Sequence, residues 1–453
     1  MLKTVGAAGV TAALAGCTSD DDDGGNGNGN GNGNGNGNGN GNGNGNGNGN
    51  GNGNGNGNGN GNGNGNGDGG GLDGRTIRYA TLNAETGDLG SLGVTIRDGA
   101  RLVARQLEGE IDAEIDLGTG DTQTDPQAGV SEADRLVDGG YPAVVGPNAS
   151  NVNLQVTRQS FIPNEVVGIS PSSTAPAVTE LDDDGYIFRT APSDALQGPV
   201  IAQVSAEEFD GNTCSTLFLN DDYGQALEEE FVNAFKNEFD GEVLERVSFE
   251  PEQPSYSSVL DEAMGADPGF LWIVGFPQSG IQLFRDFYNS YDEEFPIIVP
   301  DGLIDSSLPA EVGNDMSNVW GTAPAAQGPG ADTFAGLYEE EWGEKPSVFN
   351  AHAYDGAAVV VLANARAGEN DGTAVRDNMR EVANPGGTEI TAENLAEGVE
   401  MAAAGEEIQY SGASSGVDFD DNGDMQAVSY DVLRYGGDGD NPIQTLRTID
   451  FEG

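Results

Sequence analysis

Short apolar runs alternate with longer amphipathic segments along the chain from residue 75 onward. The short runs, which predict strands because they are rich in β-branched and apolar residues, are 77–81, 111–117, 143–145 and 166–169. The longer segments, which repeat apolar positions with a helical period, are 89–108, 126–137 and 152–161. This alternation predicts a parallel sheet with helices on both faces.

The same alternation begins again after residue 189. The predicted strands are 214–219, 243–249, 270–274, 297–299 and 319–321, and the predicted helices are 193–209, 225–239, 256–264 and 279–291. A helical region is predicted from 332 to about 404, followed by β-rich runs at 417–419, 427–434 and 443–449. The 379 residues from 75 to 453 are too many for one compact α/β unit and fit two. We therefore expect an α/β protein with two doubly wound lobes and a ligand site between the carboxyl ends of their strands.

The first 74 residues have no such pattern. Residues 25–66 repeat Gly-Asn twenty-one times, so residues 17–74 are predicted to be a flexible tether. Before it, Lys3 and an apolar run over 5–14 are typical of an export signal, residues 1–16. The LAGC at 14–17 resembles a lipobox, in which Cys17 becomes the lipidated first residue. No arginine pair precedes the run, as it would in a twin-arginine signal, so we expect the natural start to lie upstream.

The net charge of the chain excludes some kinds of binding partner and indicates the conditions in which the protein is stable. Asp and Glu number 75 against 18 Lys and Arg, a formal net charge of −57, of which −52 belongs to residues 75–453. This excludes nucleic-acid or anionic-membrane binding through basic charge. Self-repulsion of this size is tolerated where molar salt shortens the screening length to about 3 Å, which predicts a salt-adapted protein.

The sequence contains few of the residue patterns that enzymes use for catalysis. His352 is the single histidine, and we expect it on a helix face near the cleft. The G-x-S-x-G pattern at 412–416 has no histidine after it, which excludes an α/β-hydrolase triad. The sequence has too few Cys and His residues for a structural zinc site, and it lacks the phosphate-binding pattern of an ATPase. We expect no enzyme and no cofactor.

Three smaller features each have a functional and a structural interpretation. Residues 418–424 begin like a calcium loop, but Ser429 stands where a bidentate Glu belongs, and a hairpin turn explains them as well. Asn148 begins a glycosylation sequon, although a glycan there would compete with a ligand near Ser150. Cys214 lies in a predicted strand and is expected to be buried and inert.

A series of motifs resembles the branched-chain amino-acid (Leu/Ile/Val) family of solute-binding proteins, here in a haloarchaeal lipoprotein form. The motifs are 143–150, 169–176, 188–198, 220–224, 353–356 and 417–423, and they extend the resemblance over nearly all of residues 76–435. It implies a type I periplasmic-binding fold with two lobes, residues 75–192 plus 324–412 and residues 193–323 plus 413–453. The implied hinge crossings lie near 190–194, 321–325 and 411–416.

The resemblance also implies a function and a site. A monomer anchored to the outer face of the membrane would capture an α-amino acid and deliver it to a permease with ATPase subunits. The implied site residues are Ser150, Ser173 and Thr174 for the carboxylate, Asp301 for the ammonium group, Tyr223 and Phe276 as aromatic walls, and Thr86 under the ligand side chain. Hydroxyls suit a carboxylate, and an acid in a partly dry cleft suits an ammonium group.

The sequence leaves alternatives open. Ser150 and Thr174 fit helix caps, Asp301 fits a turn, and the two aromatic residues fit a core. With the same fold the ligand could be a short amide, urea or another small polar metabolite. The chain could also be a sensory module that reports its ligand to a receptor kinase.

Overall fold

The computed structural model describes residues 71–209, 212–437 and 441–452, which belong to one compact unit, Asn66–Gly453. The predicted signal over 1–16, nearly all of the tether over 17–74, and Cys17 lie outside these ranges. Within them, no helix is both long enough and apolar enough to cross a bilayer.

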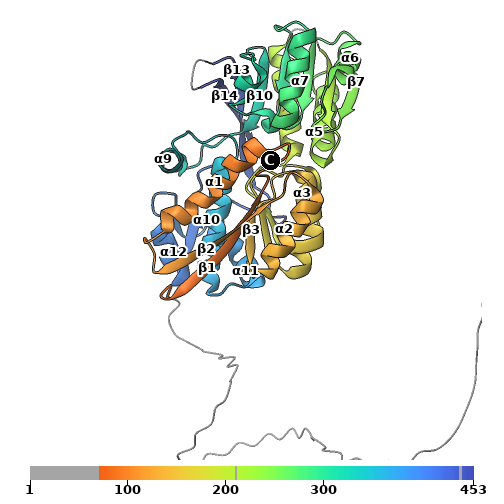
Figure 1. The fold of residues 1–453 in the computed structure, drawn as a ribbon. Coiled ribbons are helices and arrows are strands. Elements are labelled where there is room, and N and C mark those ends of the chain that lie inside the picture. The colour runs from red at the N-terminus through yellow and green to blue at the C-terminus, as the bar shows by residue number, and fades with distance from the viewer. Residues whose placement is uncertain (1–70, 210–211, 438–440, 453) are drawn as a thin grey trace, which may run out of the picture. The chain divides into compact units, whose positions relative to one another are not determined.

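The first sheet is parallel throughout and has the strand order β2-β1-β3-β4-β5. Its strands are β1 (Arg75–Asn83), β2 (Ala113–Asp121), β3 (Ala143–Val145), β4 (Val167–Ser170) and β5 (Ile187–Arg189). Its helices are α1 (Gly90–Leu107), α2 (Pro126–Asp138), α3 (Ser150–Val156), α9 (Ala331–Trp342), α10 (Asn350–Ala367), α11 (Gly372–Ala383) and α12 (Leu395–Ala403). Helix α10 packs against α1 on one face, and α2 packs against α3 on the other (Figure 1). The central helix α10 is buried along nearly its whole length, in keeping with its apolar run over 356–363.

The second sheet has the order β14-β13-β10-β9-β8-β6-β7, parallel except for β13 and β14. Its strands are β6 (Thr213–Leu219), β7 (Glu242–Phe249), β8 (Phe270–Val274), β9 (Ile297–Val299), β10 (Val319–Pro324), β13 (Ala427–Tyr435) and β14 (Ile443–Glu452). Its helices are α4 (Asp194–Glu208), α5 (Asp222–Asn237), α6 (Ser257–Met264), α7 (Pro277–Ser290) and α8 (Leu308–Val312). A small parallel pair, β11 (Thr388–Ile390) and β12 (Ile408–Tyr410), completes the described sheets.

Most predicted elements are confirmed within a few residues, and the exceptions are short or local. The strand predicted at 111–117 starts at Ala113 and runs to Asp121. The run at 417–419 is not a strand, because it contributes a single bridge between Phe419 and Met425. The helical region from 332 to 404 is interrupted by β11, and β5 and β12 were not predicted. Helix α5 starts earlier than predicted because Asp221 caps it by accepting from the backbone N–H of Gly224 at 2.8 Å.

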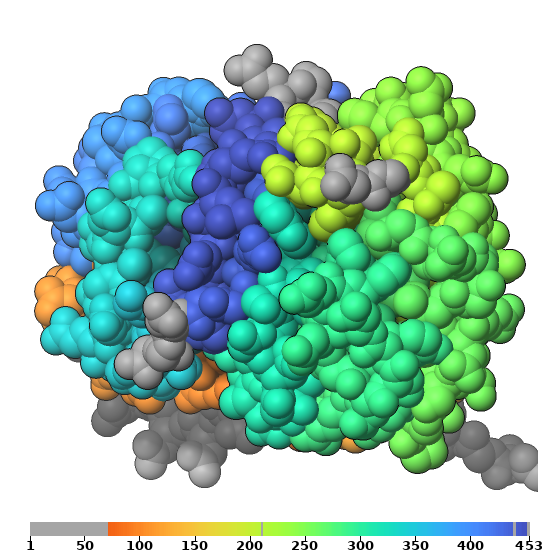
Figure 2. Space-filling view, turned by 90° about the horizontal axis from the view of Figure 1, so that it is seen from above, coloured from red at the N-terminus to blue at the C-terminus, as the bar shows by residue number. Residues whose placement is uncertain are grey.

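The segment after the third predicted crossing lies against the first sheet before it joins the second. The backbone N–H of Arg189, in the edge strand β5, donates to the carbonyl of Gly423 at 2.9 Å. Phe188 and Phe419 also meet edge to face, with ring centroids 5.2 Å apart. The chain then enters β13, and Figure 2 shows the C-terminal strands as a dark blue band between cyan first-lobe segments and green second-lobe segments. The segment around residues 417–424 therefore contacts the first lobe, although the predicted division assigned it to the second.

Candidate ligand-binding site

A pocket forms where the carboxyl ends of strands from both sheets face each other. It is lined by residues of both lobes, which are Leu89, Leu92, Ile96, Asn148, Ala149, Ser150, Ser172, Tyr223, Phe276, Asp301, Gly302 and Phe349. The free space inside is only about 10 Å³, about the room that one water molecule occupies. A ligand as large as an amino acid can therefore enter only if the lobes separate or the lining side chains move.

Asp301 supplies the charged group of the second-lobe wall. It follows β9 after one intervening residue, Pro300, is 2% exposed, and accepts a hydrogen bond from the hydroxyl of Tyr223 at 3.1 Å. Burial raises the pKa of Asp301 to about 6, although the nearby amide of Gln197 and the hydrogen bond from Tyr223 oppose the rise. The other carboxylate oxygen, Oδ2, has no partner among the described residues. Asp301 is thus a buried acid that could accept from a cation.

Tyr223 and Phe276 form one flat aromatic surface. Their rings are stacked with centroids 5.3 Å apart and planes 5° apart. Gly302 lies close to them, because a Cβ atom there would come within 2.6 Å of the Gly275 carbonyl and 2.9 Å of the Tyr223 hydroxyl. A side chain at Gly302 would therefore displace the hydroxyl that bonds Asp301.

The first lobe supplies hydroxyl groups. Ser150 is the first residue of α3, and its Oγ accepts from the backbone N–H of Ala175 at 3.2 Å. Thr174 is 1% exposed and its Oγ1 has no partner among the described residues, although it is not among the lining residues. Both side chains are therefore buried close to where the lobes meet.

The loop after β4 turns a different serine toward the pocket from the one predicted. Ser173 donates its backbone N–H to Ser170 Oγ at 2.9 Å, and its own Oγ accepts from Asn153 at 3.0 Å. Its neighbour Ser172 lines the pocket instead. Its Oγ accepts from the side chain of Asn148 at 3.1 Å. No pattern in the sequence predicts this choice, because the turn after Ser170 decides which hydroxyl faces inward.

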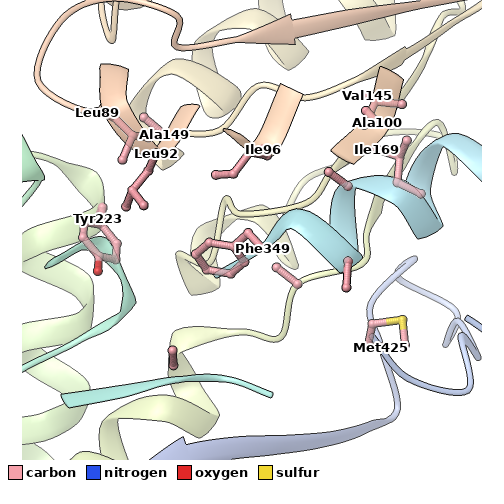
Figure 3. Close-up of a cluster of buried hydrophobic side chains, with 14 of the residues drawn as sticks. Leu89, Leu92, Ile96, Ala100, Val145, Ala149, Ile169, Tyr223, Phe349 and Met425 are labelled. Carbon is pink, nitrogen blue, oxygen red and sulfur yellow. The ribbon is translucent and has the colours of Figure 1, made fainter. Parts of the chain in front are cut away.

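Thr86 is placed away from the pocket. Its side chain is exposed, and its Oγ1 donates at 2.7 Å to Asp121, the last residue of β2. The apolar residues Leu89, Leu92 and Ile96 take the position that Thr86 was expected to share. Figure 3 shows them on first-lobe elements, across the pocket from Tyr223 and beside Phe349.

Direct hydrogen bonds join the two lobes at one edge of the pocket. Asp88, in the loop before α1, accepts from the backbone N–H of Ser279 at 2.6 Å, and its carbonyl accepts from Gln278 at 3.1 Å. Ser91 donates to Asp305 at 2.6 Å. The amino-terminal ends of α1 and α7 thus meet at the junction of the lobes (Figure 1). The structure accordingly holds the two lobes in contact.

The remaining candidate features have structural roles. Asn148 is fully buried and donates to Ser172, which leaves no room for a glycan. In the loop predicted as a turn or a calcium site, Asp424 forms a bidentate pair with Arg189. No group of three possible metal-ligating His, Cys, Asp or Glu side chains occurs among the described residues. Cys214 is buried in β6, as predicted.

His352 lies on α10 but faces a different cavity. Burial lowers its pKa to about 3, and its Nδ1 has no partner among the described residues. That cavity, of about 330 Å³, is also lined by Thr190, Ser414 and Ser415 near the predicted crossings. It has no buried charged residue, so the smaller pocket with Asp301 is the stronger candidate for a charged ligand.

Two buried side chains next to the pocket were named in sequence motifs but not as site residues. Asp194 and Gln197 lie on the first turns of α4 and are 0% and 1% exposed. The charge of Asp301 reaches Asp194 and raises its pKa. A polar pair inside a helix that is otherwise buried was the signal that could have drawn attention to them.

Comparison with known proteins identifies a matching family and several similar proteins. A family model described as "Periplasmic binding protein" matches residues 70–395. The chain is 25% identical over 342 residues to the chemotactic signal transduction system substrate-binding protein BasB of Halobacterium salinarum, covering 73% of this chain and 80% of that protein. It is 26% identical over 313 residues to the leucine-, isoleucine-, valine-, threonine- and alanine-binding protein of Pseudomonas aeruginosa, covering 67% and 82%. The crystal structure of leucine-binding protein LivK of Thermotoga maritima superposes with a TM-score of 0.68 at 23% identity, covering 82% of this chain and 98% of that one.

Proposed function

Because the chain belongs to the periplasmic binding protein family and has its type I fold, we propose that it captures an α-amino acid between its two lobes and delivers it to an ABC importer. The observation that carries the proposal is the composition of the pocket. A buried carboxylate, Asp301, faces first-lobe hydroxyls such as that of Ser150, with apolar residues and stacked aromatic rings around them. A zwitterion with an apolar side chain is complementary to all three surfaces.

The proposed roles follow from the chemistry of each wall. Asp301 binds the ammonium group, since a desolvated acid gains most from a cation that pairs with it. Ser150, Ser172 and Thr174 donate hydroxyl hydrogen bonds to the carboxylate. Leu89, Leu92 and Ile96 surround the side chain, which favours aliphatic ligands over charged ones. Ser173 supports the loop from behind, and Thr86 acts through Asp121 rather than on the ligand.

Closure is the proposed means of capture. The lobes comprise residues 75–192 plus 324–412 and residues 193–323 plus 413–453, with the crossings near 190–194, 321–325 and 411–416. Ligand favours the closed state only by binding it better than the open one. The bonds between Asp88 and Ser279 and between Ser91 and Asp305 belong to the closed state. A lipid on Cys17 and the tether over 17–74 would hold this receptor at the outer face of the membrane.

A ligand screen tests the proposal. The full chain in molar NaCl is heated with each of the twenty amino acids, short amides, urea, aromatic acids and sugars. A ligand at a hundredfold its dissociation constant stabilises the native state by about 2.7 kcal/mol, which is a visible shift in melting temperature. Shifts with leucine, isoleucine, valine or alanine support the proposal. Shifts only with compounds that lack an ammonium group would contradict it.

The likeness to BasB favours a second candidate function, the presentation of ligand to a chemotaxis receptor. The binding pocket would be the same, but the partner would be a signalling protein. Cells that lack this chain separate the two functions. Loss of labelled amino-acid uptake supports transport, whereas unchanged uptake with loss of the swimming response to the same amino acid supports sensing.

A further inference from the structure

Two buried carboxyl groups from different elements of the fold lie close to each other beside the pocket. Asp194 begins α4, just past the first crossing, and is 0% exposed, while Asp301 follows β9 and is 2% exposed. The two interact electrostatically, and each influences the phenol of Tyr223. Two such acids cannot both be ionised in a dry environment without a large cost.

The hydrogen bonds around these acids are incomplete. Asp301 Oδ1 accepts from Tyr223, but Asp301 Oδ2 and both carboxylate oxygens of Asp194 have no donor among the described residues. Thr174 Oγ1 and Gln197 Oε1, beside them, also have no partner there. Buried polar atoms are nearly always paired, so three carboxylate oxygens without donors in one cluster call for donors from outside the chain.

The charges facing Asp194 do not neutralise it. Arg189 on β5 lowers the pKa of Asp194, but its guanidinium already forms a bidentate pair with Asp424. The charges of Asp301 and of Glu230 on α5 raise the pKa of Asp194, whereas the Thr174 hydroxyl lowers it. On β13, the phenol of Tyr430 faces the same pair of acids and stays protonated.

These surroundings favour the protonated state of the pair. Burial raises the pKa of Asp194 well above its usual range, with the charge of Asp301 as the second cause, and burial raises the pKa of Asp301 to about 6. Carboxyl groups coupled in this way titrate as a pair, with apparent pKa values that belong to both. At neutral pH the empty site therefore retains a proton that exposed aspartates would have lost.

We propose that Asp194 and Asp301 share one proton while the cleft is empty, and that binding of a primary ammonium group by both carboxylates releases that proton to solvent. This inference rests on the proposed function and adds Asp194 to the ligand site. Charge and atoms balance in this exchange, because one ammonium cation enters the site, one proton leaves it, and no covalent bond of the ligand changes. The three N–H donors of a primary ammonium group match the three carboxylate oxygens that have no donor.

Proton release makes binding depend on pH with a definite sign. The empty state binds the proton more tightly than the occupied state, so ligand affinity increases as pH rises through the range of the empty pair. The increase is at most about tenfold per pH unit for one proton. The ammonium and carboxylate groups of a free amino acid both stay charged between about pH 5 and pH 7, so the ligand itself contributes no slope.

Calorimetry on the full chain tests the inference. L-leucine, L-alanine and L-glutamate are titrated in molar NaCl at pH 5, 6 and 7, each in two buffers of different ionisation enthalpy. We expect affinity for the amino acid that binds to rise about tenfold or more from pH 5 to pH 7, with nearly one proton released per ligand at pH 6. When leucine binds, 4-methylpentanoate, which lacks only the ammonium group, is expected not to bind.

Two variants assign the proton to the pair. Asp194→Asn is expected to weaken binding and to lose most of the pH slope. Asp355→Asn is the matched control, because burial raises the pKa of Asp355 to about 6 as well, but its carboxylate accepts from Tyr410 and Ala413 outside the pocket. Asp355→Asn is expected to keep the slope.

The outcomes are distinct. Binding without pH dependence and without proton release would overturn this inference and leave the proposed function standing. A slope that disappears in Asp355→Asn and persists in Asp194→Asn would overturn it as well. If none of the three amino acids binds at any pH, both proposals fail. If Asp194→Asn does not fold, the buffer comparison on the unaltered chain still decides whether a proton is released.

Discussion

The carboxylate of Asp88 in the first lobe accepts a hydrogen bond from the backbone N–H of Ser279 in the second lobe at 2.6 Å. Ser279 lies in the first turn of α7, where backbone N–H groups have no partner within the helix. Asp88 thus caps a helix of the opposite lobe. Because this cap exists only while the lobes touch, its free energy contributes to closure rather than to the folding of either lobe.

Asp88→Ala is therefore expected to weaken ligand binding without touching the ligand. A lost helix cap costs about 1 kcal/mol, which corresponds to about fivefold in affinity. The matched control is Asp125→Ala, which removes a cap within the first lobe, where Asp125 accepts from Gln127 and Ala128. The control should lower the melting temperature and leave affinity unchanged, as calorimetry and thermal unfolding would show. Equal affinity losses in both variants would contradict a role for Asp88 in closure.

Asp301→Asn is expected to reduce amino-acid affinity by about thirtyfold or more. The substitution keeps the shape and removes the charge that pairs with the ammonium group, a loss of about 2 kcal/mol for a charged hydrogen bond. Glu293→Gln, an exposed second-lobe substitution, is the control and should bind normally. Calorimetry with the amino acid identified in the screen measures both. Unchanged affinity in Asp301→Asn would remove this residue from the site.

Arg189 connects the segment before β13, which carries Asp424, to the loop that carries the predicted carboxylate ligands. Its guanidinium pairs with Asp424 at 2.6 Å and also donates to the carbonyls of Ser173 at 3.3 Å and Ala175 at 3.0 Å. The side chain of Arg189 is 0% exposed. Removing one partner of a buried pair leaves an uncompensated charge and costs about 3 to 5 kcal/mol.

Arg189→Ala is accordingly expected to lower the free energy of unfolding by about 3 kcal/mol or more. The control is Arg105→Ala, because Arg105 is half exposed and its pairs with Glu108 and Glu341 span 3.7 and 3.5 Å. A surface pair of this kind contributes less than about 1 kcal/mol. Urea unfolding in molar NaCl gives both values. Similar losses of unfolding free energy in the two variants would show that the Arg189–Asp424 pair stabilises the fold no more than a surface pair does.

Hydrophobic periodicity was sufficient to predict most of the sheet and helix order. Strands such as β8, apolar at every position, and helices such as α1 repeat the pattern over enough residues to be distinctive. Strand β5 has three residues and no periodicity to detect, and its position is fixed by pairing with β4. The run at 417–419 has β-rich composition but bonds to the side chain of the residue after α11, since Asn384 exchanges hydrogen bonds with Phe419.

The pocket was predictable only in part. The family resemblance implied Ser150, Tyr223, Phe276 and Asp301 as site residues, and all four line the pocket. The choice between Ser172 and Ser173 depends on a tight turn, and one residue along a turn reverses the direction of a side chain. Asp194 is far from Asp301 in sequence, and its relation to the pocket appears only when α4 packs under β13. Such relations come from tertiary packing, which a single sequence does not encode locally.

Cys17→Ser is expected to release the protein from the membrane or to block its maturation. A lipid requires the thiol, and the apolar run at 5–14 is too short to span a bilayer. Cys214→Ser is the matched control, since that thiol is buried in β6 and unavailable for acylation. Detergent phase separation of cell fractions and mass spectrometry of the mature amino terminus measure the outcome. A Cys17→Ser protein that stays in the detergent phase would contradict lipidation.

Acid is expected to stabilise the empty protein. Burial raises the pKa of Asp301 and Asp355 to about 6 and that of Asp221 to about 7, whereas an aspartate in the unfolded chain titrates near 3.9. The native state therefore binds more protons than the unfolded state between these values. The stabilising contribution is complete below about pH 4 and is lost as pH rises through 6 to 7.

This dependence separates folding from binding, because the two change in opposite directions with pH. The melting temperature of the empty protein in molar NaCl is expected to fall from pH 5 to pH 7.5, while the additional shift produced by saturating amino acid grows. Asp355 tests the folding part by itself, since its carboxylate accepts from Tyr410, Ala413 and Ser414 and lies outside the pocket. Asp355→Asn should remove part of the pH dependence of folding and leave that of binding intact. A melting temperature that rises steadily toward pH 7.5 would mean that these buried acids ionise without cost, and both pH arguments would then fail together.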